Sequence, residues 1–236
     1  MRSPDRGNMN EDKNTMSKTN IEKNVPEKTF DVAGIGSLLL DFIFEVDDGV
    51  LAEIDLKKGE MHLIDEDQSG KILEMMSTYT VRTAPGGSSA NTLAGISALG
   101  GTAVMLGTVG DDEHGSIYEQ KTAEHGVVSR LSVDNARGTG HAITFITPDS
   151  ERTFATHLGA ALSFRPEHVF AEDIKKSRIL HIEGYQLEDP ALRDTCIHAM
   201  EIAVQSGTKV SIDLADPALV GRNLESITDI DRKSVV

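Results

Sequence analysis

Cysteine is almost absent from this chain, since Cys196 is the only one among 236 residues. A single cysteine cannot form an internal disulfide, and the apolar run at 196–200 indicates packing in a core rather than reactivity. The eight histidines follow no His-Glu-x-x-His or paired Cys/His spacing, so a zinc site has little support. Tryptophan is missing as well, but leucine, isoleucine, valine and alanine are frequent enough to build a core.

Positive charge is also scarce. Lysine and arginine number 23 against 38 aspartates and glutamates, which gives a net charge of −15. Such an acidic surface repels phosphate backbones and anionic lipids, so we expect neither a nucleic-acid nor a membrane partner. No apolar run reaches 18 residues and no apolar signal core stands at the N-terminus, which favours a cytoplasmic protein.

Residues 1–29 are polar and lack apolar periodicity, so they are predicted to form a disordered tail. Beyond them, short apolar strands alternate with helical patterns. The predicted strands cover 30–36, 103–109, 179–182 and 209–214, and the predicted helices cover 65–79, 89–99, 115–125 and 190–205. This alternation indicates right-handed βαβ crossovers and a mostly parallel sheet, hence an α/β fold.

Two segments are typical of additional strands. The first is 41–46, and the second is 129–156, in which a Pro-Asp-Ser-Glu turn at 148–151 predicts a hairpin. We expect both segments to form a small β lid beside the main sheet.

Both common nucleotide-binding fingerprints are absent. Gly34 and Gly36 follow the first strand, but the third glycine of GxGxxG would fall at Leu39, and no GxxxxGK[ST] loop occurs.

A glycine pair, Gly86 and Gly87, instead precedes the predicted helix 89–99. Glycines before a helix N-terminus expose backbone N–H groups to a polar ligand. Asn91 adds an amide that can donate to and accept from hydroxyl groups. For the glycine pair alone, an ordinary tight turn is the alternative.

Three motifs share an arrangement with a known family: 85–91 (Pro-Gly-Gly-Ser-Ser-Ala-Asn), 99–101 (Leu-Gly-Gly) and 107–115 (Gly-Thr-Val-Gly-Asp-Asp-Glu-His-Gly). In residues and spacing they resemble the first signature of the PfkB, or ribokinase-like, carbohydrate kinases. The resemblance extends from about residue 30 to residue 223. The stretches 58–65, 152–161 and 181–185 are most similar to the adenosine-kinase-like branch, although that branch favours Asn where Ser37 stands.

The resemblance implies a three-layer α/β/α sheet with a small β lid, and binding of ATP, magnesium and a sugar or nucleoside. It implies that four residues bind the substrate hydroxyls: Asp41, Gly86, Gly87 and Asn91. A carboxylate that accepts two hydroxyls makes charge-assisted hydrogen bonds, which are stronger than neutral ones. Thr139 and Gly140 would belong to the lid that closes over the sugar and excludes water.

Three further residues are predicted at the site, each with a plain structural alternative. Arg152 would neutralise phosphate charge, unless it is a surface arginine at a hairpin end. Tyr185 would line the sugar or base pocket, unless it packs in the core. Asp213 follows a strand at the carboxyl edge, where α/β enzymes place site residues, and would serve the phosphate end of the site. A solvated loop acid is its alternative. Asp111 and Asp112 are predicted to cap a helix.

The family's catalytic base is the aspartate of a Gly-Ala-Gly-Asp motif, and an Asn-x-x-Glu motif helps to organise magnesium. Neither motif occurs in the 236 residues, so we assign no catalytic and no metal-binding residue. We expect the parent protein to be the kinase and this fragment to be inactive. The alternative is a non-catalytic module that binds a sugar or nucleoside or interacts with a partner. A homodimer through the lid is also expected.

The last six residues, 231–236, continue no apolar pattern. Asp-Arg-Lys-Ser-Val-Val is also the translation of a common sequencing adapter. We therefore expect 30–230 to be the N-terminal part of a kinase domain and 231–236 to be a non-native tail. A genuine short C-terminus is the alternative.

Overall fold

The computed structural model describes residues 27–215 and 217–234. Within them, a parallel sheet has the strand order β10-β9-β1-β5-β6. Its strands are β1 (Phe30–Ile35), β5 (Ala103–Gly110), β6 (Val128–Asp134), β9 (Ser177–Ile182) and β10 (Lys209–Ile212). β5 is buried along its whole length, as expected for a central strand covered on both faces.

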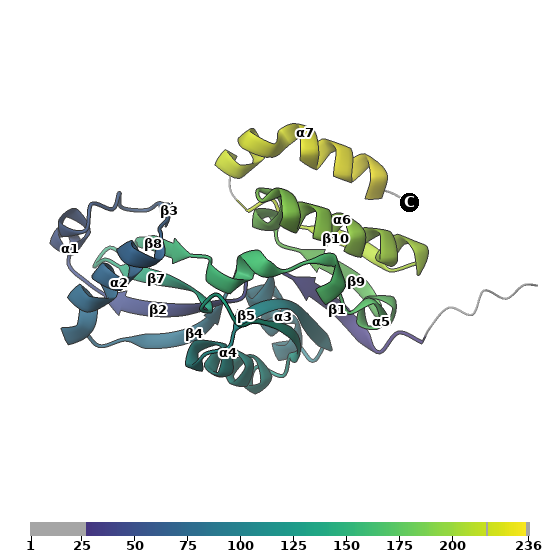
Figure 1. Ribbon diagram of the computed structural model, residues 1–236, viewed down its shortest axis with the longest axis horizontal. Coiled ribbons are helices and arrows are strands. Elements are labelled where there is room, and N and C mark those ends of the chain that lie inside the picture. The colour runs from purple at the N-terminus through teal and green to yellow at the C-terminus, as the bar shows by residue number, and fades with distance from the viewer. Residues whose placement is uncertain (1–26, 216, 235–236) are drawn as a thin grey trace, which may run out of the picture.

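Helices cover both faces of this sheet (Figure 1). One side carries α3 (Ser88–Ala98) and α4 (Glu113–Glu124), which pack through Leu93 and Tyr118. The other side carries α5 (Ala171–Lys175), α6 (Pro190–Gln205) and, outermost, α7 (Pro217–Ser234). The predicted three-layer α/β/α arrangement is therefore confirmed. No helix in the described ranges is long and apolar enough to cross a bilayer.

A second sheet stands beside the first and forms the lid (Figure 1). Its order is β3-β8-β7-β2-β4, with β2 (Leu39–Glu45), β3 (Met61–Leu63), β4 (Arg82–Gly86), β7 (Gly140–Ile146) and β8 (Arg152–His157). The helices α1 (Asp48–Glu53) and α2 (Glu66–Met75) cover one face around Phe44, Ile72 and Phe145. The 3₁₀ turns are η1 (Met76–Thr78), η2 (Gly159–Ser163), η3 (Pro166–His168) and η4 (Gly184–Leu187).

The predicted lid segment 129–156 is divided in the structure, so its first boundary is wrong. β6 pairs in parallel with β5 and belongs to the main sheet. The reason is that Gly126, with φ +74°, ends α4 and returns the chain beside β5 as an ordinary βαβ crossover. Of this segment, only β7 and β8 belong to the lid, which also contains the edge strands β3 and β4.

Local signals in the sequence were more reliable than this boundary. Asp65 and Gln68 form a capping box at the start of α2, where the sequence predicts that a helix begins. The turn at 148–151 joins β7 and β8 into an antiparallel hairpin. Asp112 caps α4 by accepting a hydrogen bond from the Gly115 amide at 2.8 Å.

The predicted tail lies outside the described residues except for 27–29. Lys28 donates from Nζ to the Thr208 hydroxyl and to the Lys175 carbonyl, both at 2.8 Å. The Thr29 amide also donates to the Lys176 carbonyl. Order therefore includes at least two residues that the sequence analysis placed in the tail, because their polar groups are used by the main domain. At the other end, α7 includes 231–234, and the non-native origin of 231–236 stays a prediction.

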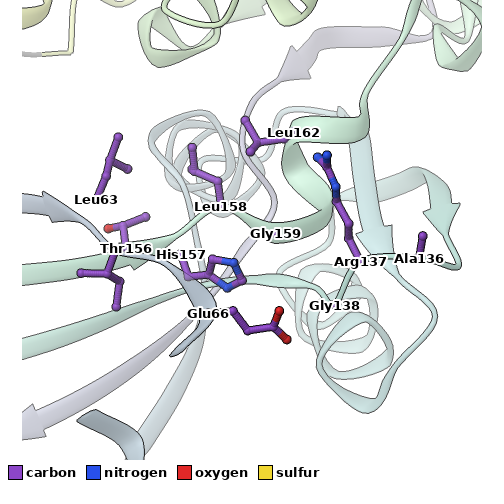
Figure 2. Close-up of a pocket in the computed structure, with 11 residues that line it drawn as sticks. Leu63, Glu66, Ala136, Arg137, Gly138, Thr156, His157, Leu158, Gly159 and Leu162 are labelled. Carbon is purple, nitrogen blue, oxygen red and sulfur yellow. The ribbon is translucent and has the colours of Figure 1, made fainter. Parts of the chain in front are cut away.

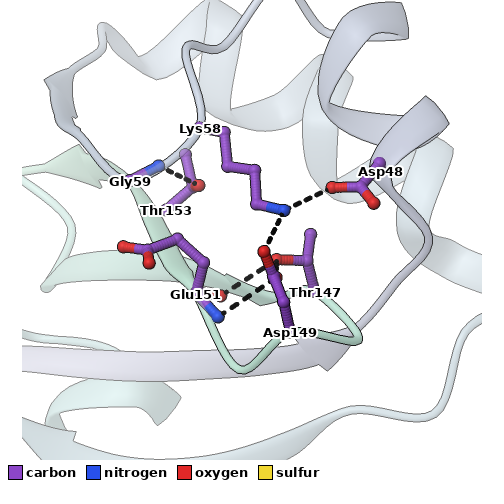
Figure 3. Close-up of polar contacts among 7 residues, drawn as sticks. All are labelled: Asp48, Lys58, Gly59, Thr147, Asp149, Glu151 and Thr153. Atoms are coloured by element: carbon purple, nitrogen blue, oxygen red, sulfur yellow. Dashed lines mark hydrogen bonds and ion pairs between the residues drawn. The ribbon is translucent and has the colours of Figure 1, made fainter.

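A polar cluster ties the loop before β3 to the β7–β8 hairpin (Figure 3). Lys58 Nζ lies 2.6 Å from Asp48 Oδ1 and 2.7 Å from Asp149 Oδ2. The Gly59 amide donates to Thr153 Oγ1 at 2.9 Å. Exposed ion pairs of this kind contribute less than about 1 kcal/mol each, so the cluster fixes the position of β3 more than it stabilises the fold.

His141 in β7 is buried beneath α2, and we expect this burial to make the fold sensitive to acid. Its Nε2 contacts the Ser69 hydroxyl at 2.5 Å, and its ring lies 5.3 Å from that of His157. Burial lowers the pKa of His141 to about 4, mainly by desolvation of the charged form. The unfolded chain binds this proton near pH 6.5, so the free energy of unfolding should fall as the pH decreases from 6.5 towards 4.

Between pH 7 and pH 4.5, we expect the free energy of unfolding to fall by on the order of 2 kcal/mol less in His141→Gln than in the wild type. Chemical denaturation of the wild type and the variant at pH 7 and pH 4.5 measures the difference. The difference is the informative quantity, because Asp41 and Glu183 titrate with the opposite sign. An identical pH dependence in both proteins would contradict this prediction.

Candidate functional site

A cavity of about 550 Å³ lies between the uncovered face of the lid and the carboxyl ends of the main strands. This is the edge at which open α/β sheets bind ligands. Its polar lining includes Ser37, Asp41, Ser88, Asn91, Glu183 and Tyr185, and its apolar lining includes Leu39, Met61, Leu63, Phe154, Leu158 and Leu192. The cavity thus combines a few polar groups with broad apolar walls, as small-molecule sites do.

Asp41 sits in the middle of β2, where it pairs with Ala84 of β4 and Ala142 of β7. Its carboxylate lies directly against Gly86, because a Cβ built on Gly86 would be 2.1 Å from Asp41 Oδ1. The next residue, Gly87, has φ +96°, and a Cβ there would be 2.4 Å from the Ser37 carbonyl oxygen. Both glycines are therefore required by the close approach of these protein atoms, a reason that the sequence analysis did not give.

The glycine turn leads straight into α3, which brings polar side chains to the cavity. Ser88 and Asn91 line it from the first turn of the helix. The backbone N–H of Asn91 donates to the Gly87 carbonyl at 3.1 Å, so Asn91 lies one helical turn beyond the glycine pair. The structure therefore brings Asp41, Gly87 and Asn91 to one cavity, with Gly86 behind the carboxylate.

The ionisation of Asp41 is shifted towards neutral pH. Burial raises the pKa of Asp41 to about 7, and the positive charge of Arg152 partly opposes this rise. Arg152 is exposed at the start of β8 and is not part of the cavity lining. It therefore acts on Asp41 electrostatically, from the hairpin end that the sequence predicted.

Thr139 and Gly140 lie outside the cavity lining, at the joint between the main sheet and the lid. The Thr139 amide and hydroxyl donate to the two carboxylate oxygens of Asp112 at 2.7 and 2.6 Å, and its hydroxyl accepts from the Gly110 amide. Gly140 is packed against the Leu158 carbonyl oxygen. These contacts give both residues a structural function in connecting the lid.

Tyr185 and Asp213 have different environments. Tyr185 lines the cavity from η4, and Phe154 lines it from β8 of the lid. Asp213 follows β10 at the predicted strand end, but its carboxylate accepts from the Ser88 hydroxyl at 2.6 Å and the Ala215 amide at 2.9 Å. Asp213 thus connects the start of α3 to the end of β10 and does not line the cavity.

Sequence reasoning did not single out Phe154 or Glu183. Both fall within stretches that carried the family resemblance, 152–161 and 181–185. Glu183 also follows the buried strand β9 at its carboxyl end, which is a signal for site residues in α/β folds. The same rule drew attention to Asp213 and could have identified Glu183.

Within 27–215 and 217–234, no three His, Cys, Asp or Glu side chains are arranged to hold a metal ion. The nearby acids Asp213 and Glu183 are engaged by hydroxyl and amide donors of the protein. The described residues do not by themselves fit magnesium.

A smaller chamber of about 340 Å³ adjoins the cavity and shares Leu63, Thr156, Leu158 and Leu162 with it. Figure 2 shows Glu66, His157 and Arg137 around this chamber.

The three layers, the lid and the cavity between them give the chain the architecture of a ribokinase-like sugar or nucleoside kinase domain. Residues 59–230 match the family described as pfkB family carbohydrate kinase, and the chain belongs to this family.

Its relatives include adenosine kinases and fructokinases. The chain is 27% identical over 202 residues to the adenosine kinase of Dictyostelium discoideum, an alignment that covers 83% of this chain and 58% of that protein. It is 31% identical over 133 residues to the probable fructokinase-4 of Arabidopsis thaliana, covering 55% of this chain and 41% of that protein. The chain therefore spans less than two thirds of these relatives.

Solved structures support the same fold. The probable sugar kinase of Rhizobium etli CFN 42 superimposes with a TM-score of 0.81 at 30% identity, covering 88% of this chain and 62% of that one. The adenosine kinase of Sinorhizobium meliloti has a TM-score of 0.80 at 31% identity, covering 87% and 62%.

Proposed function

We propose that this chain is the substrate-binding part of an ATP- and magnesium-dependent kinase that phosphorylates a hydroxyl of a sugar or nucleoside. The observation that carries the proposal is the convergence of Asp41, Gly87 and Asn91 on one cavity beneath a lid. An ionised Asp41 accepts hydrogen bonds from two hydroxyls, and the Asn91 amide can add another. Adjacent hydroxyls are the feature that sugars and ribosides share.

A nucleoside is favoured over a free sugar by the rest of the cavity. Phe154 lines it from the lid and Tyr185 from the main sheet side, and a flat base can stack against aromatic rings. The adjoining chamber supplies further space beyond the hydroxyl-binding end. The adenosine kinases among the relatives are consistent with this choice.

The residues of this chain would bind and orient the acceptor, and the lid would exclude water from it. ATP would supply the phosphoryl group, and magnesium would neutralise its charge. The 236 residues contain no Gly-Ala-Gly-Asp motif to supply a base, so we expect binding without phosphoryl transfer by the chain alone. The alternative is a non-catalytic module that binds a sugar or nucleoside. The reading frame downstream in the gene distinguishes the two.

Titration calorimetry of the 236-residue chain tests the proposed site. We expect adenosine to bind more tightly than ribose or fructose. Asp41→Asn should weaken adenosine binding by about 10- to 100-fold, because it removes charge-assisted hydrogen bonds. Asn91→Ala should weaken it by about fivefold.

Asp111→Asn is the matched control, since Asp111 is exposed and lies outside the cavity lining. Its affinity should equal that of the wild type. The proposed function would be refuted if Asp41→Asn and Asn91→Ala bound adenosine as tightly as the wild type does. It would also be refuted if no ligand in the panel bound.

A further inference from the structure

Glu183 brings a second buried carboxyl group to the cavity, from the main sheet rather than from the lid. It follows β9, its exposure is 2%, and it is part of the cavity lining. Its backbone amide donates to the Ile35 carbonyl, so the end of β9 is fixed beside the end of β1. A carboxyl group buried to this extent is costly unless donors surround it.

Donors from two segments do surround it. The Ser89 amide donates to Glu183 Oε2 at 3.4 Å, and the Ser37 amide and hydroxyl lie close enough to the same carboxyl group to lower its pKa. Gln186 Nε2 donates to Ser37 Oγ at 2.8 Å, which holds that hydroxyl in place. The Ser37 side chain, the departure from the adenosine-kinase pattern, thus lies beside Glu183 and is held there by Gln186.

The backbone closes tightly around this carboxylate. A Cβ on Gly36 would lie 2.6 Å from Glu183 Oε2, and a Cβ on Gly87 would lie 3.5 Å from it. The loop after β1 and the glycine turn before α3 are therefore packed against one side chain. Any displacement of Glu183 would release both segments.

The N-terminus of helix α3 lacks a side-chain hydrogen-bond acceptor of its own. Its N-cap is Gly87, which has no side chain to accept a hydrogen bond from the first turn. Unsatisfied N–H groups and the helix dipole favour a negative charge at this end. Glu183 supplies a carboxyl acceptor from another element, at the turn that presents Ser88 and Asn91 to the cavity.

We propose that Glu183 is the positioning residue of the hydroxyl-binding site, fixing the glycine turn and the first turn of α3 so that Asn91 and Asp41 face the same ligand. This inference rests on the proposed function. Glu183 acts through the backbone that it holds, rather than by contact with the reacting atoms.

Ligand affinity and thermal stability should respond differently to a substitution at Glu183. Burial and the negative charge of Asp213 raise the pKa of Glu183 to about 7, so the ionised form is unfavourable in the folded chain. Removing this carboxyl group relieves its desolvation cost, and that gain offsets the cost of leaving the Ser89 amide without its acceptor. Glu183→Met should therefore keep or raise the melting temperature while it releases the glycine turn.

Three measurements on the full chain test this: thermal melting, amide hydrogen exchange in the first turn of α3, and calorimetry with adenosine. For Glu183→Met we expect an unchanged or higher melting temperature, at least tenfold faster exchange of the Ser89 amide and at least tenfold weaker binding. Glu183→Gln keeps a carbonyl acceptor and should restore both exchange and affinity to within about threefold. Glu201→Gln, an exposed substitution on α6, is the control.

Wild-type exchange and affinity in Glu183→Met would overturn the proposal. A parallel loss of melting temperature and affinity in both the Met and the Gln variants would also overturn it, because it would indicate a merely structural residue. The exchange measurement needs no ligand, so it tests Glu183 even if adenosine does not bind. Failure of the proposed function would be recognised separately, by unchanged affinity in Asp41→Asn.

Discussion

Replacing Gly86 with alanine is expected to reduce adenosine affinity at least 100-fold, which corresponds to about 2.8 kcal/mol. The added Cβ would lie 2.1 Å from Asp41 Oδ1 and 2.5 Å from its Cγ, so the carboxylate has to leave its present position. Asp41 has a short side chain on a strand paired on both sides, which leaves little room for adjustment. Calorimetry with adenosine, together with thermal melting, measures both consequences.

Gly95→Ala is the matched control because it introduces the same methyl group on the nearby helix α3. No atom lies within 4 Å of a Cβ at Gly95, and alanine in a helix interior is about 0.5–1 kcal/mol more favourable than glycine. We expect it to raise the melting temperature and leave the affinity unchanged. If Gly86→Ala bound adenosine within threefold of the wild type, the position of Asp41 in the site would be wrong.

The second large effect concerns pH. If Asp41 binds hydroxyls in its ionised form, the affinity for an uncharged ligand should rise about tenfold between pH 6 and pH 8, since its pKa is raised to about 7. Asp41→Asn should remove this dependence. Calorimetry at pH 6, 7 and 8 measures it, and a wild-type affinity independent of pH would contradict the assigned role.

The contribution of Asp41 to the free energy of unfolding should fall as the pH rises, whereas its contribution to ligand affinity should increase. Folded Asp41 keeps its proton up to about pH 7, whereas an unfolded aspartate releases it near pH 4. The stabilisation from this raised pKa is present below pH 4 and is lost as the pH rises through 7. Asp41→Asn should therefore exceed the wild type in stability at pH 8 by on the order of 2–4 kcal/mol, and match it near pH 4. Urea denaturation at the two pH values checks this.

The sequence predicted those parts of the fold that depend on local chemistry. The alternation of strands and helices, the capping box at Asp65 and the hairpin at 148–151 all follow from short-range patterns. The position of β6 in the main sheet could not be predicted in this way, because an amphipathic strand has the same local pattern in either sheet. Only its pairing with β5 determines the sheet to which it belongs.

The site was predictable to a similar extent. Asp41, Gly87, Asn91 and Tyr185 could be assigned from motifs, and the structure brings all four to one cavity. The function of Thr139 depends on Asp112, a residue 27 positions earlier, which no local pattern connects to it. Glu183 likewise acquires its contacts from Ser37 and Ser89, which are distant in the sequence. Long-range partners of this kind become visible only in the folded chain.

A crystal structure of the 236-residue chain with adenosine tests the central claim most directly. We expect two ribose hydroxyls within hydrogen-bonding distance of the Asp41 carboxylate, a third contact from Asn91, and the base between Phe154 and Tyr185. Adenosine bound outside this cavity, or inside it with Asp41 making no contact to a hydroxyl, would contradict the account.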